Sequence, residues 1–513
     1  MKRTAMLLFV AVVTLWLWNA PASMFGIDGL TLVQQRVIAI FAFSTLMWIL
    51  EIVPAWATSV GIIGLLLAFT SDSGIHFFQT IATSAQLGDD LFATGVLAGN
   101  TAASTVSGGL ADGGGLAALV DQPVGQLLSY KDIMATFADP VIMLFIGGFI
   151  LAIAATKTGL DAQLARALIK PFGTKSNNVL LGFILITGVF SMFVSNTATA
   201  AMMLTFLAPV FRQLPPDGKG RIALTLSIPV AANLGGMATP IGTPPNAIAL
   251  KYLNDPAGLN LGVSFGEWMA LMFPLVIVLL VFAWLMLIKL FPFKQKYIQI
   301  EIEGSMERSA KSWIVIVTFF LTVACWMLES YTGINSYTVA LLPFVVFALT
   351  GVIDQKDLEQ INWGVIWMVA GGFALGYALN HSGLAANAVK SIPFGEWSAL
   401  VIAIISGLIC YFLSNFISNS ATAALLMPIL TVVCTGMGDK LDAIGETSTV
   451  LIGIALAASS AMVLPISTPP NALAYSTNLV EQKDMVKIGL IVGVVSLTIG
   501  YGVLILIGQT GWL

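Results

Sequence analysis

The chain has 513 residues, of which 58% are hydrophobic and only 9% are charged. Soluble domains carry roughly a quarter charged residues, so this composition excludes an ordinary soluble enzyme and indicates a membrane protein. The net charge of −4 gives no reason to expect nucleic acid or an acidic partner. The chain has only two histidines, which argues against a histidine-rich metal site. Its three cysteines are an odd number and lie within apolar runs, which argues against a disulfide framework.

Apolar stretches that could cross a bilayer recur along the whole chain, which predicts an all-α polytopic membrane protein. The first stretch has a basic tip and a small-residue segment after it, as a cleaved signal peptide would. We interpret residues 1–29 instead as an uncleaved first transmembrane helix. About 11 spans are expected, near residues 4–20, 33–50, 55–70, 140–156, 222–250, 267–290, 313–329, 335–352, 362–380, 447–479 and 488–510.

Two further apolar stretches, 178–211 and 397–433, are interrupted by polar residues near their middle. We expect each to enter the membrane and turn back as a re-entrant hairpin. This arrangement, with a cytoplasmic N-terminus, puts 17 of the 22 basic residues on the cytoplasmic side, as the positive-inside rule requires. It also places the C-terminus outside the cytoplasm, and the chain is typical of a bacterial inner-membrane protein.

Two long polar segments divide the chain. Residues 71–138 are rich in Gly, Ala and Ser and are predicted to be an extracytoplasmic insertion. Residues 292–312 are the main charged linker and are predicted to be cytoplasmic. The domains are therefore expected to be a first repeat over 30–291 and a second repeat over 313–513.

The two halves match in the same order at a nearly constant offset. Gly147-Gly148-Phe149 recurs 224 residues later, Ser195-Asn196-Thr197 recurs 223 residues later as Ser418-Asn419-Ser420, and Thr243-Pro244-Pro245-Asn246 recurs 225 residues later. Each half holds five spans, and an odd number inverts the second copy. Inverted repeats place a substrate and ion site near the membrane midplane, where broken helices from both halves meet.

The repeated polar phrases have a chemistry that suits an anion and a cation together. A broken helix offers free N–H groups to an anion at one end and carbonyl oxygens to a small cation such as Na⁺ at the other. No charged residue lies in 177–211, 222–250, 397–438 or 447–480. Taken alone, a Ser-Asn-Thr phrase could simply allow close packing and a Pro-Pro pair could be a kink. Their pairing in the repeat favours a shared site, whereas the glycine pairs are interpreted as packing residues.

These twin motifs resemble those of the divalent anion:sodium symporter family, over about residues 30–510. The resemblance implies sodium-coupled uptake of C4-dicarboxylates such as succinate, malate and fumarate. It also implies an elevator-type transporter and a homodimer embedded in membrane lipid, with Na⁺ as coupling ion, no organic cofactor and no enzymatic activity. Family relatives that exchange dicarboxylates without sodium, or that carry sulfate or citrate, leave those alternatives open.

Site residues follow from the resemblance. The sodium ligands it implies are Ser191, Ser195, Asn196 and Gly242 for one site, and Ser414, Ser418, Asn419 and Ser467 for the other. The substrate contacts it implies are Asn196, Thr197, Asn419, Ser420, Thr243, Pro244, Thr468 and Pro469. Ser420 departs from the family's threonine but keeps the hydroxyl. An intramembrane hydrolase would need an acidic pair or a Ser–His or Ser–Lys pair, which these segments lack.

Overall fold

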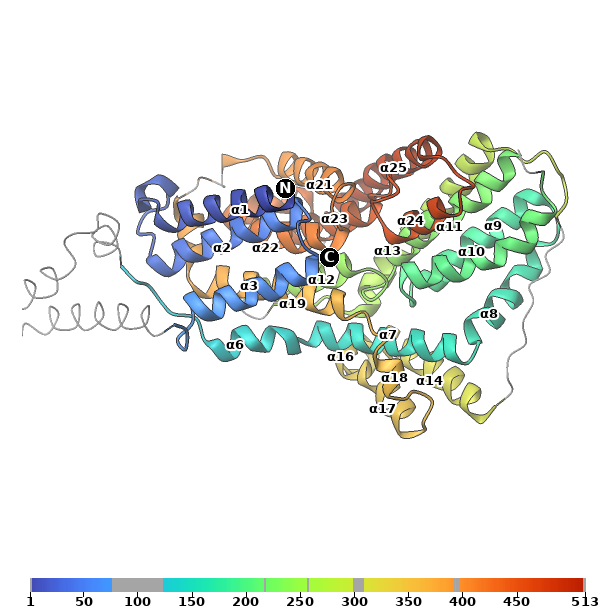
Figure 1. Cartoon of the computed structure of the whole chain (residues 1–513), viewed down its shortest axis with the longest axis horizontal. Helices are drawn as coiled ribbons and strands as arrows, with labels where there is room; N and C mark the ends of the chain where they lie inside the picture. The colour runs from blue at the N-terminus through green and yellow to red at the C-terminus, as the bar shows by residue number, and fades with distance from the viewer. Residues whose placement is uncertain are drawn as a thin grey trace, which may run out of the picture. The chain divides into compact units, whose positions relative to one another are not determined.

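The computed structural model describes the chain at residues 2–75, 123–215, 218–255, 258–298, 309–391, 393 and 396–510. Within these residues the regular structure is helical, without a named strand, which confirms the predicted all-α fold (Figure 1). Most of the predicted insertion (76–122) and the middle of the predicted linker (299–308) lie outside the described residues.

One compact unit comprises Met1–Asp139, Ile366–Trp397 and Pro428–Gly438. In it α1 and α3 both pack against α2, whose first turn is closed by a capping box between Thr31 and Gln34. The buried Gln34 side chain also donates to the carbonyl oxygen of Ser382 at 2.8 Å. Its helices are α1 (Lys2–Asn19), α2 (Leu32–Ile49), α3 (Ala55–Phe69), α6 (Tyr130–Ala135), most of α19 (Trp363–His381) and α20 (Leu384–Ser391).

The other compact unit comprises Pro140–Val365, Ser398–Met427 and Asp439–Leu513, and it holds all of the predicted site residues. Helix α22 (Asn419–Met437) begins in this unit, and its residues from Pro428 belong to the first one. The remaining helices are α7 (Pro140–Lys157), α8 (Leu160–Ile169), α9 (Ser176–Ser191), α10 (Asn196–Arg212), α11 (Lys219–Gly236), α12 (Pro244–Leu253), α13 (Phe265–Leu290), α14 (Ala310–Met327), α15 (Glu329–Thr332), α16 (Ser336–Val339), α17 (Leu341–Leu349), α18 (Gln355–Leu358), α21 (Ala399–Ser414), α23 (Glu446–Ser460), α24 (Pro469–Ser476) and α25 (Gln482–Gly508).

The order of helices from α7 to α13 recurs from α19 to α25. Corresponding helices have nearly equal lengths: α9 and α21 have 16 residues each, and α13 and α25 have 26 and 27. The sequence repeat is therefore also a repeat of helices. The inversion of the second copy and the domain boundaries at 30–291 and 313–513 stay predictions.

Each repeat contains two interruptions. The predicted hairpins break at 192–195, between α9 and α10, and at 415–418, between α21 and α22. The stretches expected as single spans at 222–250 and 447–479 are instead two helices each, separated by 237–243 and 461–468. A Pro-Pro pair follows each break and occupies the first turn of the next helix, where its missing N–H groups need no helical partner.

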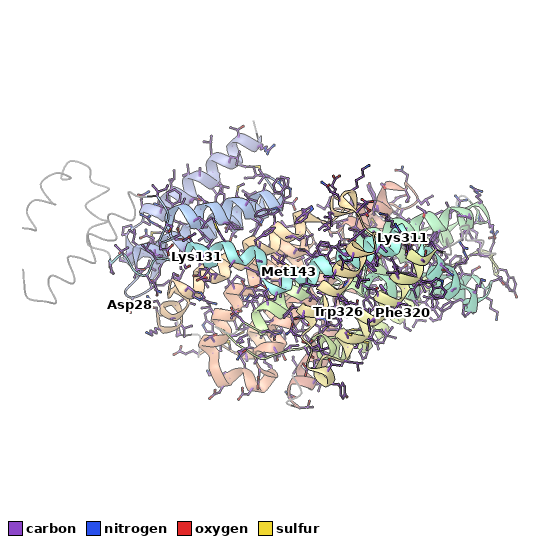
Figure 2. All side chains as sticks on the ribbon, turned by 90° about the horizontal axis from the view of Figure 1, so that it is seen from below. Asp28, Lys131, Met143, Lys311, Phe320 and Trp326 are labelled. Atoms are coloured by element: carbon purple, nitrogen blue, oxygen red, sulfur yellow. The ribbon has the colours of Figure 1, made fainter. Side chains whose placement is uncertain are left out.

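Seven of the described helices are long and apolar enough to cross a membrane, and several shorter apolar helices accompany them. Helix α14 shows how such a helix is divided between an inner and an outer face. Trp326, labelled in Figure 2, stacks on Phe265 with ring centroids 4.9 Å apart and donates to the carbonyl oxygen of Ser336 at 3.0 Å. Phe320 on the same helix is 56% exposed, as a lipid-facing side chain would be.

The end of α7 is joined to α18 by an ion-pair cluster. Lys157 Nζ lies 2.5 Å from Asp357 and 3.1 Å from Asp354. The hydrogen bond from Lys157, helped by one from the backbone N–H of Lys356, holds the pKa of the Asp354 carboxyl below its usual range. Asp357 is buried and also accepts from the backbone N–H of Asp354, so this carboxylate fixes the start of α18.

The first glycine of each glycine pair allows a close approach. A Cβ atom at Gly147 would overlap the carbonyl oxygen of Ala340, and one at Gly371 would overlap Ser59. At Gly148 the nearest atom to such a Cβ is in Ile241, at an ordinary 3.4 Å. These contacts agree with the interpretation of Gly147 and Gly371 as packing residues.

We predict that Gly147→Ala destabilises the purified protein by about 1–3 kcal/mol, because a carbonyl oxygen of the backbone cannot move aside for the methyl group. Gly148→Ala is the matched control and should have little effect. The measurement is thermal denaturation of both variants in the same detergent. Equal melting temperatures for Gly147→Ala and the unmodified protein would contradict the close approach of α7 to Ala340.

Candidate functional site

The first hairpin break places its polar phrase at the start of α10. The Ser195 hydroxyl accepts a hydrogen bond from the backbone N–H of Ala198 at 3.3 Å, so Ser195 is the N-cap of α10. Asn196, the first residue of this helix, is half-buried, and Thr197 is exposed. Ser191, at the last position of α9, is fully buried. The break therefore turns Ser191 and Asn196 toward the protein interior from two different helix ends.

Four oxygen atoms gather where α9 and α11 end. The Ser191 hydroxyl lies 2.8 Å from the carbonyl oxygen of Ala232 and 2.6 Å from the side-chain oxygen of Asn196. That Asn196 oxygen also lies 3.3 Å from the Ala232 carbonyl oxygen and 3.1 Å from the Gly242 carbonyl oxygen. With the amide in this orientation a single hydroxyl hydrogen cannot serve all of these acceptors, which favours the opposite orientation of the Asn196 amide.

Two arrangements would relieve this crowding of acceptors. A half-turn of the Asn196 amide would point its nitrogen at the three other oxygens. A small hard cation among the four oxygens would do the same, because such ions prefer oxygen ligands. The carboxyl ends of α9 and α11 add the negative end of their helix dipoles at this place, which favours a cation. Ser191, Asn196, Ala232 and Gly242 are named below as the oxygen cluster.

Two glycines make room for the oxygen cluster. A Cβ atom at Gly236 would lie 2.6 Å from the Asn196 side-chain oxygen, and one at Gly242 would lie 2.5 Å from the carbonyl oxygen of Gly236. Real Cβ atoms do not come this close to other heavy atoms. The backbone at 237–243 can therefore fold over Asn196 only because both positions are glycine.

The second repeat has the same residue types in a more open arrangement. Ser418 accepts from the backbone N–H of Ala421 at 3.1 Å and so repeats the role of Ser195. Ser414 is fully buried, Asn419 is half-buried and Ser420 is buried. In the described part of the chain, Ser414 Oγ and Asn419 Oδ1 are buried atoms without a hydrogen-bond partner of normal geometry. Hydroxyl and amide oxygens such as these are suitable ligands for a small cation.

Both repeats join their hairpin break to their second break through a hydroxyl group. In the first, Thr239 donates to the carbonyl oxygen of Met192 and accepts from the N–H of Gly242. In the second, Ser467 donates to the carbonyl oxygen of Asn415 and accepts from the N–H of Leu464. The hydroxyl stands at opposite ends of the two breaks, yet it makes equivalent bonds. Ser467 is one of the sodium ligands that the resemblance implies, and its side chain has this bridging role.

The motif asparagines Asn246 and Asn471 hold the second breaks in place. The buried Asn246 amide nitrogen lies 3.0, 3.2 and 2.8 Å from the carbonyl oxygens of Gly236, Met237 and Thr239. The Asn471 amide nitrogen lies 2.8 and 2.9 Å from the carbonyl oxygens of Met462 and Leu464. These carbonyls have no helical partner beyond the break, so the asparagines supply the missing donors.

The phrases that follow the second breaks start the helices α12 and α24. Thr243 and Thr468 are both buried N-cap residues, and Pro244 and Pro469 occupy the first helical position. Pro244 is half-buried and Pro469 is exposed. The first two residues of each helix are prolines without an N–H, and the N–H groups of Asn246 and Asn471 are bonded to Thr243 and Thr468, so these helix starts contribute the positive end of a helix dipole rather than free N–H donors.

Parts of the two repeats pack together within this unit. Helices α10 and α11 pack on α24, and α12 packs on α23. The buried Asn233 of α11 donates to the Thr468 hydroxyl at 3.1 Å. The structure thus brings Ser191, Asn196 and Gly242 together, and their role as sodium ligands stays a prediction. No described contact joins Thr197 or Ser420 to the rest, and their roles stay predictions.

Several residues of the site were not predicted from the sequence. The Ala232 carbonyl could not be predicted from the sequence, because every residue carries a backbone carbonyl group. Asn415 could have been found, since Ser414-Asn415 repeats the Ser-Asn pair four residues before Ser418-Asn419. Asn246 and Asn471 were in the quoted motifs, but only the structure gives them a role. Among the described residues, no group of three or more His, Cys, Asp or Glu could hold a transition metal.

The citrate transporter family matches residues 107–445 of the chain. The chain is a member of the citrate transporter family. A sodium-dependent dicarboxylate transporter, SdcS of Staphylococcus saprophyticus, is 30% identical over 417 residues, which are 74% of this chain and 79% of that protein. An uncharacterized transporter of Haemophilus influenzae is 33% identical over 405 residues, which are 73% of this chain and 83% of that protein.

Among solved structures, the YdaH transporter of Alcanivorax borkumensis is similar, with a TM-score of 0.50 and 14% identity. The match covers 75% of this chain and 88% of that one, and at this identity it supports the fold alone. As a citrate transporter family member, the chain is a multi-pass membrane transporter and not an enzyme. The family resemblance found in the sequence is confirmed.

We predict that Asn246→Asp is more damaging than Asn246→Ala. Alanine removes the donor that serves three buried carbonyl oxygens and should lower the free energy of unfolding by about 1–3 kcal/mol. Aspartate should lower it further, because its negatively charged carboxylate would face the partial negative charges of these oxygens. The measurement is the yield of monodisperse protein together with its melting temperature. Asn335→Asp, at an N-cap where a carboxylate is also suitable, is the control. If the two Asn246 variants proved equally stable, the capping role would be wrong.

Proposed function

We propose that this transporter takes up C4-dicarboxylates such as succinate, malate and fumarate together with sodium. The observation that carries the proposal is the oxygen cluster, in which the Ser191 hydroxyl, the Asn196 amide and the carbonyl oxygens of Ala232 and Gly242 gather at the carboxyl ends of α9 and α11. The names of relatives from staphylococci, which are sodium-dependent dicarboxylate transporters, support sodium coupling and a dicarboxylate substrate.

Sodium would bind in both repeats. In the first, Ser191, Asn196 and Gly242 are the proposed ligands, with the Ala232 carbonyl added to them and Ser195 as the N-cap beside them. In the second, Ser414 and Asn419 supply oxygens that have no hydrogen-bond partner in the described chain. The proposed ligands of this second site also include Ser418 and Ser467. The walls carry no charge, so bound sodium would provide the positive charge that a dianion needs.

The dicarboxylate would bind beside these ions through hydrogen-bond donors. One carboxylate would meet Asn196, Thr197 and the start of α10, and the other would meet Asn419, Ser420 and the start of α22. The phrases at the starts of α12 and α24 would complete the pocket with Thr243, Pro244, Thr468 and Pro469. Helix N-termini suit carboxylates because their N–H groups are unpaired and lie at the positive end of the dipole.

The proposed transport cycle uses the two repeats as an inverted pair. The re-entrant hairpins α9–α10 and α21–α22 would move with the site as an elevator, within a homodimer surrounded by lipid. The exposed apolar side chains of α14 and α21 suit such a lipid boundary. We place the protein in a bacterial inner membrane, with the N-terminus in the cytoplasm and the C-terminus outside it.

Citrate is the second candidate substrate, because the family that matches the chain is described as citrate transporters. Sulfate, and exchange of dicarboxylates without sodium, are further alternatives for this fold. A citrate molecule has a third carboxylate and would need more room and more donors than a C4-dicarboxylate.

Uptake of radiolabelled succinate into proteoliposomes tests the proposal. We expect accumulation under an inward Na⁺ gradient and none under an equal K⁺ gradient. Competition with unlabelled citrate and sulfate ranks the substrates. Uptake only into liposomes preloaded with dicarboxylate would indicate an exchanger, and preferential uptake of citrate or sulfate would replace succinate as the substrate.

We further predict that Gly236→Ala raises the sodium concentration needed for half-maximal uptake at least about tenfold, because its methyl group would press on the Asn196 oxygen. Gly64→Ala, where no atom lies within 4 Å of the added methyl group, is the control. The readout is the sodium dependence of initial uptake rates at fixed succinate. An unchanged sodium dependence in a folded Gly236→Ala protein would remove the oxygen cluster as a sodium site.

A further inference from the structure

Asn233 of α11 links the first repeat to the second through two hydrogen bonds. Its amide nitrogen lies 3.1 Å from the Thr468 hydroxyl oxygen and 3.3 Å from the Asn471 side-chain oxygen. Asn233 is only 2% exposed. The repeat gives it no counterpart, because the corresponding position in α23 is Ala457 or Ala458. Nothing in the twin motifs accounts for this buried asparagine.

The direction of these hydrogen bonds is fixed by backbone groups that can act in one way only. The carbonyl oxygens of Met462 and Leu464 only accept, so the group of Asn471 that faces them must be its NH₂. The other end of the Asn471 amide is then an oxygen, which can only accept. Because this oxygen faces Asn233, the Asn233 amide must present its NH₂ there as well.

The same NH₂ group of Asn233 fixes the Thr468 hydroxyl. Thr468 Oγ1 accepts from Asn233 at 3.1 Å and from the backbone N–H of Asn471 at 3.3 Å. A hydroxyl oxygen has two lone pairs and one hydrogen, and both lone pairs are now used. The Thr468 hydroxyl can therefore only donate its hydrogen, and it offers no lone pair to a cation.

We infer that Asn233 is a positioning residue that commits the Thr468 hydroxyl to donating to a substrate carboxylate. This inference rests on the proposed function, in which Thr468 lines the dicarboxylate pocket. A hydrogen bond from a hydroxyl to a carboxylate is charge-assisted and short, so fixing the donor direction in advance raises affinity for an anion. It also makes this subsite unfit for Na⁺.

The first repeat lacks this device. Thr243 makes no side-chain capping hydrogen bond, and in the described structure the buried Asn246 Oδ1 has no hydrogen-bond partner. The hydroxyl of Thr243 is thus not held to one direction. Thr243 and Thr468 therefore differ in their hydrogen bonding. The substrate carboxylate that binds at the second repeat would be the one that meets a hydroxyl able only to donate, that of Thr468.

The test compares Asn233→Ala, Asn233→Asp and Thr468→Val in proteoliposomes under a fixed Na⁺ gradient. We expect Asn233→Ala to raise the KM for succinate about tenfold and to leave the sodium concentration for half-maximal uptake unchanged. Asn233→Asp has nearly the same shape, but its carboxylate accepts the Thr468 hydrogen and adds a negative charge. Its KM should rise further, to about a hundredfold.

The double variant Asn233→Ala/Thr468→Val separates positioning from general stability. If Asn233 acts through Thr468, adding Asn233→Ala to Thr468→Val changes KM no further, whereas independent effects multiply. Asn254→Ala is the matched structural control, since Asn254 also makes two hydrogen bonds, both to Val263. It should lower the melting temperature without raising KM.

The outcomes distinguish the inference from the proposed function. A raised KM in Thr468→Val, with normal values in both Asn233 variants, would overturn the inference and leave the pocket in place. A normal KM in Thr468→Val would remove Thr468 from the pocket and the inference with it. Equal shifts in KM and in sodium dependence would show that Asn233 is only structural. Absence of sodium-driven succinate uptake by the unmodified protein would refute the proposed function itself.

Discussion

The rest of this structure depends on one constraint, which is that backbone groups freed by a broken helix must find partners where no water is available. The breaks at 237–243 and 461–468 leave carbonyl oxygens without helical donors. Asn246 and Asn471 supply those donors from the next helix. Each break is therefore stabilised by the asparagine of the Thr-Pro-Pro-Asn motif that follows it. The Gly242 carbonyl within the first break lies 3.1 Å from the Asn196 amide, so the stabilised break also places a backbone oxygen beside the hairpin.

The two repeats meet this constraint with different chemistry. The hydroxyl that bridges the breaks is Thr239 at the start of one break and Ser467 at the end of the other. The first repeat closes its oxygens into a compact cluster, and the second keeps Asn419 Oδ1 without a hydrogen-bond partner in the part of the chain that the structure describes. The two repeats thus share the same order of helices but differ in how their polar atoms are bonded.

Much of the helix order could be predicted, because hydropathy reports span length and the polar residues in the middle of 178–211 and 397–433 report the hairpin breaks. Ser191, Asn196 and Gly242 meet as the family resemblance implied. The Ala232 carbonyl could not be predicted, since a backbone group leaves no mark in the sequence. Asn233 was also missed, because the repeat gives it no counterpart and its partners lie more than 230 residues away. The division of 222–250 into two helices was not predicted, because the residues on both sides of the break are apolar and read as one continuous span.

The neutral walls of the site have a consequence for how the carrier would respond to acidity. No group in 177–211, 222–250, 397–438 or 447–480 gains or loses a proton near neutral pH. The binding surface would therefore present the same donors in an acidic and in an alkaline medium. Any response to external pH would then come from the substrate, whose monoanion gives up half of its attraction to bound sodium. Such a carrier would sense acidity through the ionisation of its cargo.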